Sequence, residues 1–393
     1  MAVYASWEAG TILAPPMFSF ALESRDARAR KGVLKTPHGT IETPAFMPVG
    51  TAGAVKAMTL RDLEDLKPSI LLANTYHLML RPGDRLVAEL GGLHGFTGWR
   101  GPFLTDSGGY QVLSLSALRK LSDEGAAFKS HLDGSEHLLT PEKAVEVQMN
   151  LGADLVMPLD ECPPADAPRE ALRVAVLRTR LWAERSLLAL TRQDQRMFGI
   201  VQGGTDPQLR EESARGLMDL PFWGYAIGGL AVGESAPERD GVLAGLDPIL
   251  PSEKPRYLMG VGTPEDILNA VAQGVDLFDC VLPTRNGRNG QLFTSAGRLS
   301  IRNARFREDP RPPDASCSCF TCRTASRAYL RHLHTAGEIT GAVLMTLHNL
   351  AFYLDTLKKI RETIRSGQFE IFRMEMLRKL TASEVESPSS QEP

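Results

Sequence analysis

The sequence predicts an α/β protein: a (β/α)8 TIM barrel with hairpin insertions and a zinc-binding subdomain inserted after strand eight. Short apolar segments, each bounded by glycine, proline or an acid, recur with room for a helix between them. Such segments are typical of parallel strands buried on both faces. The length of 393 residues suits one barrel with insertions. The eight segments are 45–49, 69–74, 101–105, 154–159, 197–201, 224–227, 256–261 and 275–281.

Two helices between these segments can be located from their ends. Thr140 precedes Pro141, apolar residues follow at helical spacing, and Gly152 ends the pattern, so a helix is expected over 141–151. A longer helix is expected from about 169 to 190.

A hairpin insertion is expected between strands three and four. Asp133 and Gly134 separate the segments 128–132 and 136–140, and this dipeptide is a strong signal for a two-residue hairpin turn.

The barrel pattern ends near residue 285, where a basic, cysteine-containing stretch begins. A helix is expected to resume near Gly337, with an apolar stripe formed by Ile339, Val343, Leu347, Leu350, Leu354 and Leu357. The expected organisation is an N-terminal extension (1–17), the catalytic barrel (18–284), a zinc-binding, arginine-rich subdomain (285–348), a helical part packing on the barrel (349–380) and a disordered tail (381–393).

Composition excludes several classes of protein. Hydrophobic residues make up 43% and charged residues 23% of the chain, which excludes disordered and fibrous proteins. No segment approaches the roughly 20 apolar residues of a membrane span, and no signal peptide is recognised, so a cytoplasmic location without membrane contact is expected. The net charge is only −3, yet residues 285–334 hold ten arginines, no lysine and three acids. This cluster is either a phosphate-binding surface or a solvated charged face.

Carboxylates and glycines follow several of the predicted strands. In barrels of this class the chemistry lies at the carboxyl ends of the strands, where Asp106 and Asp279 are expected. Two carboxylates that converge there permit substitution at an anomeric carbon, one as nucleophile and one handling the proton of the leaving group. A third acid, Asp160, with Gln202 and the bare backbone of Gly229, has the hydrogen-bonding groups to read the edge of a purine.

Three of the five cysteines crowd into six residues, a spacing that suits a metal better than disulfides. Cys317, Cys319 and Cys322, followed after 25 residues by His348, are the ligand types of a closed, structural zinc site.

The chain resembles the bacterial tRNA-guanine transglycosylases, also called queuine tRNA-ribosyltransferases, from about residue 18 to 380. The resemblance rests on the zinc quartet and on motifs in the same order: TDSGGYQ at 105–111, LDGS at 132–135, LDEC at 159–162, GIVQG at 199–203, GGLAVGE at 228–234, YLMGVG at 257–262 and FDCVLPTR at 278–285.

The resemblance implies an exchange reaction on tRNA. The wobble guanine (position 34) of tRNAs with GUN anticodons would be replaced by 7-aminomethyl-7-deazaguanine, the prequeuosine base, in queuosine biosynthesis. Val232 beside Cys162 favours this small bacterial substrate. The partners implied are the tRNA anticodon loop, guanine and 7-deazaguanine bases, and a second copy of the chain in a homodimer built partly with the zinc region, with one structural Zn²⁺ per subunit.

The same resemblance implies a role for each site residue. Asp279 is the expected nucleophile, forming a covalent ribosyl-aspartate, and Asp106 the general acid/base. The base would be bound by Asp160, Gln202, Gly229 and the Leu230 amide, in a pocket lined by Ser107, Cys162, Glu234, Tyr257 and Met259. Arg285 and Arg288 would contact the anticodon.

Other readings of these residues stay open at this stage. Asp106 or Asp279 alone could be a helix cap. Cys162 and Cys280 are of a type that is more often buried than reactive, and His77 and His131 could serve local hydrogen bonds. A metallohydrolase with catalytic zinc would need an His-x-His pair after strand one, which the sequence lacks. The remaining alternatives are a non-enzymatic RNA-binding zinc module and a relative acting on another base or tRNA position.

Overall fold

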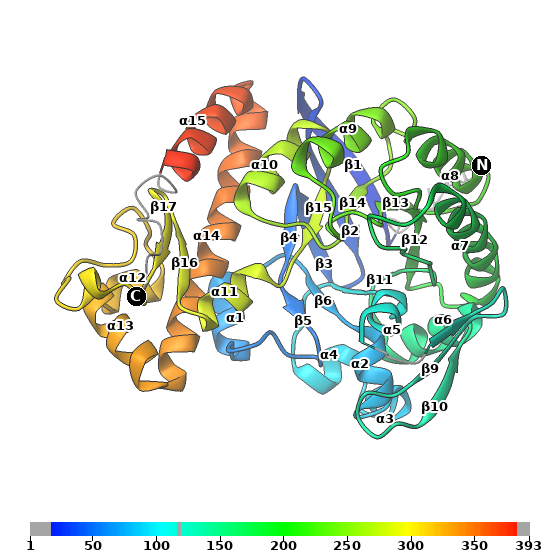
Figure 1. Ribbon diagram of the computed structural model, residues 1–393, viewed down its shortest axis with the longest axis horizontal. Coiled ribbons are helices and arrows are strands. Elements are labelled where there is room, and N and C mark those ends of the chain that lie inside the picture. The colour runs from blue at the N-terminus through cyan, green and yellow to red at the C-terminus, as the bar shows by residue number, and fades with distance from the viewer. Residues whose placement is uncertain (1–16, 116–118, 383–393) are drawn as a thin grey trace, which may run out of the picture.

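The computed structural model describes residues 17–115 and 119–382 and confirms the barrel (Figure 1). Nine strands pair in parallel around a sheet in the order β4-β15-β14-β13-β12-β11-β7-β6-β5. Their bounds are β4 Ala45–Met47, β5 Val49–Gly50, β6 Leu71–Ala73, β7 Phe103–Thr105, β11 Leu155–Val156, β12 Arg196–Val201, β13 Gly224–Ile227, β14 Arg256–Leu258 and β15 Leu277–Asp279.

The sheet curls back on itself through its first segment. Pro48 alone separates β4, which pairs with β15, from β5, which pairs with β6. Since proline has no N–H to donate to a ladder, one predicted strand is split in two. All eight predicted strand segments are therefore present, several of them shorter than expected.

The helices that surround the barrel include both that were predicted. Helix α6 (Pro141–Leu151) begins after Thr140, whose side chain accepts from the Lys143 N–H, and ends at Gly152 in the left-handed conformation. Helix α7 is Arg169–Ala189. The other helices of this part are α1 Leu60–Leu66, α2 Thr75–Leu80, α3 Asp84–Glu89, α4 Gly92–Thr97, α5 Gly109–Leu115, α8 Pro207–Met218, α9 Ala236–Leu246 and α10 Pro264–Ala272.

Two antiparallel sheets are added to the barrel. The expected hairpin is formed by β9 (Ala126–Lys129) and β10 (Glu136–Leu139), and β8 (Arg119–Leu121) pairs with β9 as a third strand. The predicted two-residue turn was wrong, because residues 130–135 connect the two strands. Before the barrel, β1 (Ser19–Asp26), β2 (Ala29–Thr36) and β3 (Gly39–Thr43) form a sheet that the sequence did not predict. Its strands are rich in charged residues, so their hydrophobic signal is weak.

The subdomain after strand eight is also present. Helix α11 (Leu282–Arg288) is followed by the paired strands β16 (Gln291–Thr294) and β17 (Gly297–Ser300), the 3-10 turn η1 (Ala304–Phe306), and helices α12 (Phe320–Thr324) and α13 (Arg327–Ala336). Strands β16 and β17 and helices α12 and α13 lie on one side of the long helix α14 (Ile339–Ser366), while the barrel lies on the other (Figure 1). Helix α11 packs against α14 and contributes residues to the barrel cavity. Helix α15 (Phe369–Ala382) follows.

Helix α14 runs without a break through residue 348, where the sequence-based division has a boundary. Leu347, Leu350 and Leu357 of its predicted stripe are buried, but Ile339 is 80% exposed, so the inclusion of Ile339 was wrong. Ile339 is the first residue of the helix and extends beyond the surfaces against which the later turns pack.

The core has two layers, as expected of a barrel. Apolar side chains from the strands fill the interior, among them Leu72, Leu104, Ile200 and Leu277. A larger cluster joins the outer face of the strands to the helices, including α14. Within the described residues, none of the helices is both long and apolar enough to cross a membrane. The expected N-terminal extension and tail fall almost entirely outside those residues.

Packing of α14 on the barrel predicts a test of stability. Leu350→Ala is expected to lower the free energy of unfolding by about 2–5 kcal/mol, because the fully buried side chain leaves a cavity. Ile339→Ala on the same helix should change it by less than about 0.5 kcal/mol. Urea denaturation followed by circular dichroism measures both. Equal effects of the two substitutions would contradict this packing.

Candidate active site and metal centre

A cavity of about 760 Å³ opens at the carboxyl ends of the barrel strands. Most of the predicted site residues line it: Asp106, Ser107, Asp160, Cys162, Gly229, Leu230, Tyr257, Met259, Asp279, Arg285 and Arg288. Gln202 and Glu234 are not among the lining residues and lie behind the wall, where each binds a group that does line it. The sequence therefore identified residues around one cavity, but it did not indicate that Gln202 and Glu234 lie behind the cavity wall.

Asp279 ends strand β15 with its carboxylate held by two donors. Oδ1 accepts from the Tyr257 hydroxyl at 2.6 Å and from the Gly260 N–H at 2.7 Å. Burial raises the pKa of Asp279, and these two hydrogen bonds oppose the rise because they stabilise the anion. The result is a buried carboxylate with a fixed orientation.

Asp106 follows strand β7 and is held by the turn after the neighbouring strand β6. Its Oδ2 accepts from the Asn74 amide at 2.5 Å and its Oδ1 from the Thr75 N–H at 2.8 Å. Burial raises the pKa of Asp106 to about 6, hydrogen bonds from Asn74, Thr75 and Gln111 oppose this, and the charge of Asp279 adds to it. Asp106 and Asp279 thus face one cavity closely enough for their charges to interact.

Asp160 forms a second polar centre in the cavity. Its two oxygens accept from the Ser107 hydroxyl at 3.3 Å and from the Gln202 amide at 2.8 Å. Burial raises the pKa of Asp160 to about 6, against these hydrogen bonds. The Gln202 carbonyl oxygen is buried without a hydrogen-bond partner among the described residues.

The loop after strand β13 brings bare backbone to the cavity. Gly229 has φ +64°, and a Cβ there would lie 2.3 Å from the Gln202 carbonyl oxygen, so only glycine fits. Glu234 accepts from the N–H groups of Ala231 at 2.6 Å and Val232 at 3.1 Å. Glu234 therefore shapes the loop rather than lining the pocket.

The two thiols near the site are poor nucleophiles. Burial raises the pKa of both Cys162 and Cys280 to about 12, so each remains a neutral thiol at neutral pH. Both line the cavity as small apolar groups.

Two cations of α11, Arg285 and Arg288, stand at the cavity. Arg285 is exposed, while burial and the charge of Arg285 lower the pKa of Arg288. Their side of the cavity can therefore receive an anionic ligand.

Sequence reasoning missed Asn74, Thr75 and Lys56, and it considered His77 only as a local hydrogen-bonding group. Asn74 and Thr75 fix Asp106, although their place directly after a strand was a usable signal. Lys56 and His77 also line the cavity, and burial lowers the pKa of His77. His131 accepts or donates a local hydrogen bond with the Tyr76 hydroxyl at 2.8 Å, as expected.

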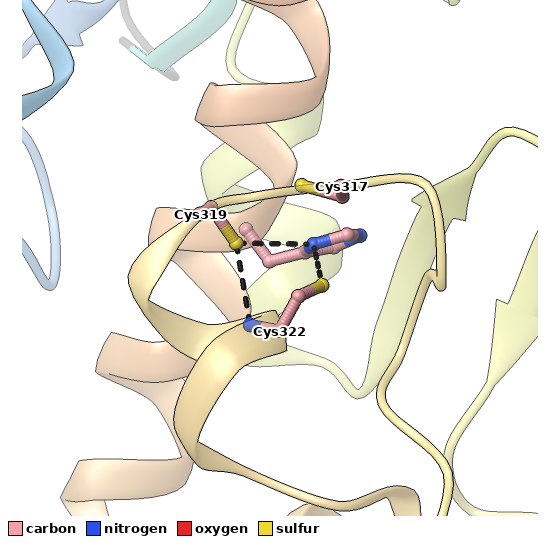
Figure 2. A group of neighbouring side chains, drawn as sticks. Cys317, Cys319 and Cys322 are labelled. Carbon is pink, nitrogen blue, oxygen red and sulfur yellow. Dashed lines mark hydrogen bonds between the residues drawn. The ribbon is translucent and has the colours of Figure 1, made fainter.

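The predicted metal ligands come together between α12 and α14. One donor atom from each of Cys317, Cys319, Cys322 and His348 lies within 4.8 Å of the others. Figure 2 shows the three cysteine side chains gathered where the loop before α12 meets that helix. The buried His348 holds Nε2 2.8 Å from the Phe293 carbonyl, and its Nδ1 lies 3.2 Å from Cys322 Sγ. When Nε2–H donates to the Phe293 carbonyl, the lone pair of Nδ1 faces the cysteine sulfurs and is free to bind a metal ion. The cluster can therefore hold a metal ion.

A second group of metal-ligand types lies near the amino ends of the strands and has a different geometry. His38, His94 and Asp154 also lie within 4.8 Å of one another. However, the two imidazole rings stack 3.5 Å apart at 17°, so their in-plane lone pairs run side by side instead of meeting at one ion. Asp154 also accepts from the Phe103 N–H at 2.9 Å. We assign this group a structural role.

Comparison with known proteins agrees with this geometry. A family model described as queuine tRNA-ribosyltransferase matches residues 25–382. A protein named queuine tRNA-ribosyltransferase from Thermus thermophilus is 53% identical over 368 residues, which are 94% of this chain and 96% of that protein. Proteins of the same name from Solidesulfovibrio magneticus and Neisseria meningitidis are each 54% identical, over 91% and 90% of this chain and 96% of their own length.

The raised pKa of Asp160 predicts a pH-dependent stability difference. Because the folded-state pKa lies above the unfolded value, the proton stabilises the fold at low pH, and this contribution is lost as the pH rises through about 6. Asp160→Asn cannot ionise. Its free energy of unfolding relative to that of wild type should therefore be about 2 kcal/mol higher at pH 7.5 than at pH 4. Urea denaturation at both pH values measures this. A difference that does not change with pH would contradict the buried position of this carboxyl.

Proposed function

This chain belongs to the queuine tRNA-ribosyltransferase family, and we propose that Asp279 carries its reaction as a covalent nucleophile. The chain is a tRNA-guanine transglycosylase, a pentosyltransferase. The exchange we propose replaces the wobble guanine of tRNAs with GUN anticodons by 7-aminomethyl-7-deazaguanine.

In the first step Asp279 attacks C1′ of the ribose, and the glycosidic bond to guanine breaks. The hydrogen bonds from Tyr257 and Gly260 hold the carboxylate in one orientation, as an attack on a fixed carbon requires. Because Asp279 is buried, little water is present to stabilise its anion before the attack. The same exclusion of water protects the ribosyl ester from hydrolysis after the attack. The incoming base then displaces Asp279, and two displacements retain the anomeric configuration.

Asp106 handles the proton in both steps. An acid with a pKa of about 6 can be protonated in one step and ionised in the next at neutral pH, which is the property needed in general acid/base catalysis. As guanine leaves, it takes a proton from Asp106, and the incoming base returns one. The hydrogen bonds from Asn74 and Thr75 stabilise the ionised form that exists between the two steps.

The base occupies the pocket around Asp160. We assign its hydrogen-bonding edge to Asp160, Gln202 and the Gly229–Leu230 backbone. Cys162, Tyr257 and Met259 line the pocket, as does Ser107, whose hydroxyl donates to Asp160. Glu234 acts through the loop, and Val232, which lines the same cavity, favours the smaller aminomethyl base by its branched side chain.

Arg285 and Arg288 are proposed to contact the anticodon loop. They line the cavity on the side that leads to the arginine-rich region after residue 285, so a nucleotide entering the cavity would bring its flanking phosphates to them. Extrusion of the target base is the usual mode of chemistry on a single-stranded loop.

One observation carries the proposal: Asp106 and Asp279, from different strands, line one cavity, where the charge of Asp279 raises the pKa of Asp106. A hydrolase with catalytic metal is disfavoured because none of the four Cys/His ligands is among the residues lining that cavity. A non-enzymatic RNA-binding module gives no reason to bury two interacting carboxylates at the ends of strands.

The metal we propose is one structural Zn²⁺ per subunit, since three thiolates and one imidazole form the usual closed zinc set. We also propose a cytoplasmic homodimer that uses this region. Phe320 and Tyr329, 51% and 48% exposed, are aromatic residues of the kind enriched at protein interfaces.

Substitution of Asp279 tests the mechanism. Asp279→Ala should lower exchange of labelled guanine into tRNA at least about a thousandfold, because the covalent step is lost. Asp279→Asn should slow or trap that step. Asp219→Ala, on an exposed carboxylate at the end of α8, is the control and should exchange at the wild-type rate. Undiminished exchange by the Asp279→Ala protein would rule the mechanism out, and mass spectrometry of the tRNA would identify which base enters.

Removal of one thiol tests the metal. Elemental analysis of the purified protein should find about one zinc per chain, and Cys322→Ala should lose it together with thermal stability. Cys162→Ala, which removes a thiol outside the cluster, should keep its zinc. Full zinc content in Cys322→Ala, or a different metal in the wild type, would contradict the assignment.

A further inference from the structure

Arg210, on helix α8, is one of the largest fully enclosed side chains of the protein and lies behind the cavity wall. It is 2% exposed and is not among the residues that line the cavity. No ion pair of Arg210 is found among residues 17–115 and 119–382. A buried guanidinium without an ion-pair partner is costly unless hydrogen bonds satisfy its donors.

The guanidinium is bonded instead to backbone carbonyls of two neighbouring loops. Nε donates to the Gly204 oxygen and Nη1 to the Val201 oxygen, each at 2.7 Å. Nη2 donates to the Gly229 oxygen at 3.4 Å. Val201 ends β12, Gly204 lies in the turn that follows, and Gly229 lies in the turn after β13. One planar group therefore ties together the ends of two adjacent strands.

The bond to Gly229 fixes the orientation of a peptide at the cavity. In a trans peptide the C=O and the following N–H point in opposite directions. The Gly229 carbonyl is directed at Arg210, behind the wall, so the N–H of Leu230 is directed the opposite way. Gly229 and Leu230 both line the cavity.

We propose that Arg210 is a positioning residue for recognition of the base: it holds the Gly229 carbonyl inward and thereby presents the Leu230 N–H to a carbonyl oxygen on a purine-type ring. This inference rests on the proposed function. A lysine would keep the positive charge but could not span three carbonyls, whereas methionine would remove both the charge and the donors.

The test compares Arg210→Lys and Arg210→Met with wild type in the guanine exchange assay. The KM for the free base should rise about tenfold to a hundredfold in Arg210→Met, because a donor to the base is misplaced. The rise should be smaller in Arg210→Lys. The KM for tRNA and kcat should change less than about threefold in both proteins, since Asp106 and Asp279 keep their own partners.

The control for loss of a buried arginine is Arg30→Met. Arg30 pairs with Asp276 near the start of β15, at the other end of the barrel from the cavity. This substitution should lower the melting temperature and leave the KM for the base unchanged. If Arg210→Met does not fold, Arg210→Lys decides.

If wild type catalyses the exchange but a folded Arg210 variant keeps the wild-type KM for the base, the role of Arg210 is overturned and the proposed function is not. Equal rises in the KM for base and for tRNA, or the same base effect in Arg30→Met, would also overturn the positioning role by indicating a general structural role. Absence of exchange in wild type would instead refute the proposed function.

Discussion

The cost of burying carboxylates in one cavity is the constraint on which the site depends. Asp106, Asp160 and Asp279 all lie in surroundings that raise their pKa values. Each would be neutralised if left without donors, yet each receives hydrogen bonds from groups fixed by the fold: a side-chain amide, a phenol or a backbone N–H. The balance leaves the pKa values of Asp106 and Asp160 at about 6. At neutral pH Asp106 can therefore exchange a proton, and the ionisation of Asp160 can respond to a bound ligand.

The barrel supplies those donors because its strands are parallel. The carboxyl end of each strand lies beside that of its neighbour, so the turn after one strand can serve the acid of the next. The turn after β6 thus holds Asp106 of β7, and the turn after β14 holds Asp279 of β15. This relation explains why residues far apart in sequence meet at one cavity.

Helix α14 connects the predicted metal-ligand cluster to the strands that border the cavity. His348 faces the cysteines, while the next residue, Asn349, donates to the carbonyls of Pro283, in the first turn of α11, and of Gln291, the first residue of β16. One turn further on, the Tyr353 hydroxyl donates to the Gly262 carbonyl at the cavity. An ion that fixes α12 against α14 would therefore also steady the segment that carries Arg285 and Arg288.

The features that the sequence predicted well are those with local signals. The strands are short apolar runs, α6 has a cap and a terminal glycine, and the metal ligands have a recognisable spacing. The β1–β3 sheet was missed because its strands are rich in charged residues and show no regular alternation of apolar and polar positions, so their hydrophobic signal is weak. The positions of Gln202, Glu234 and Arg210 behind the cavity wall depend on how adjacent turns pack, and no local pattern encodes that depth.

The central claim is that one of two interacting acids bonds to the sugar while the other moves the proton. The most direct measurement incubates the enzyme with tRNA in the absence of free base, quenches the reaction with acid and locates any ribose-linked adduct by peptide mass spectrometry. The account predicts an adduct on the peptide that contains Asp279. An adduct on the peptide that contains Asp106, or exchange-competent enzyme that never yields an adduct, would contradict it.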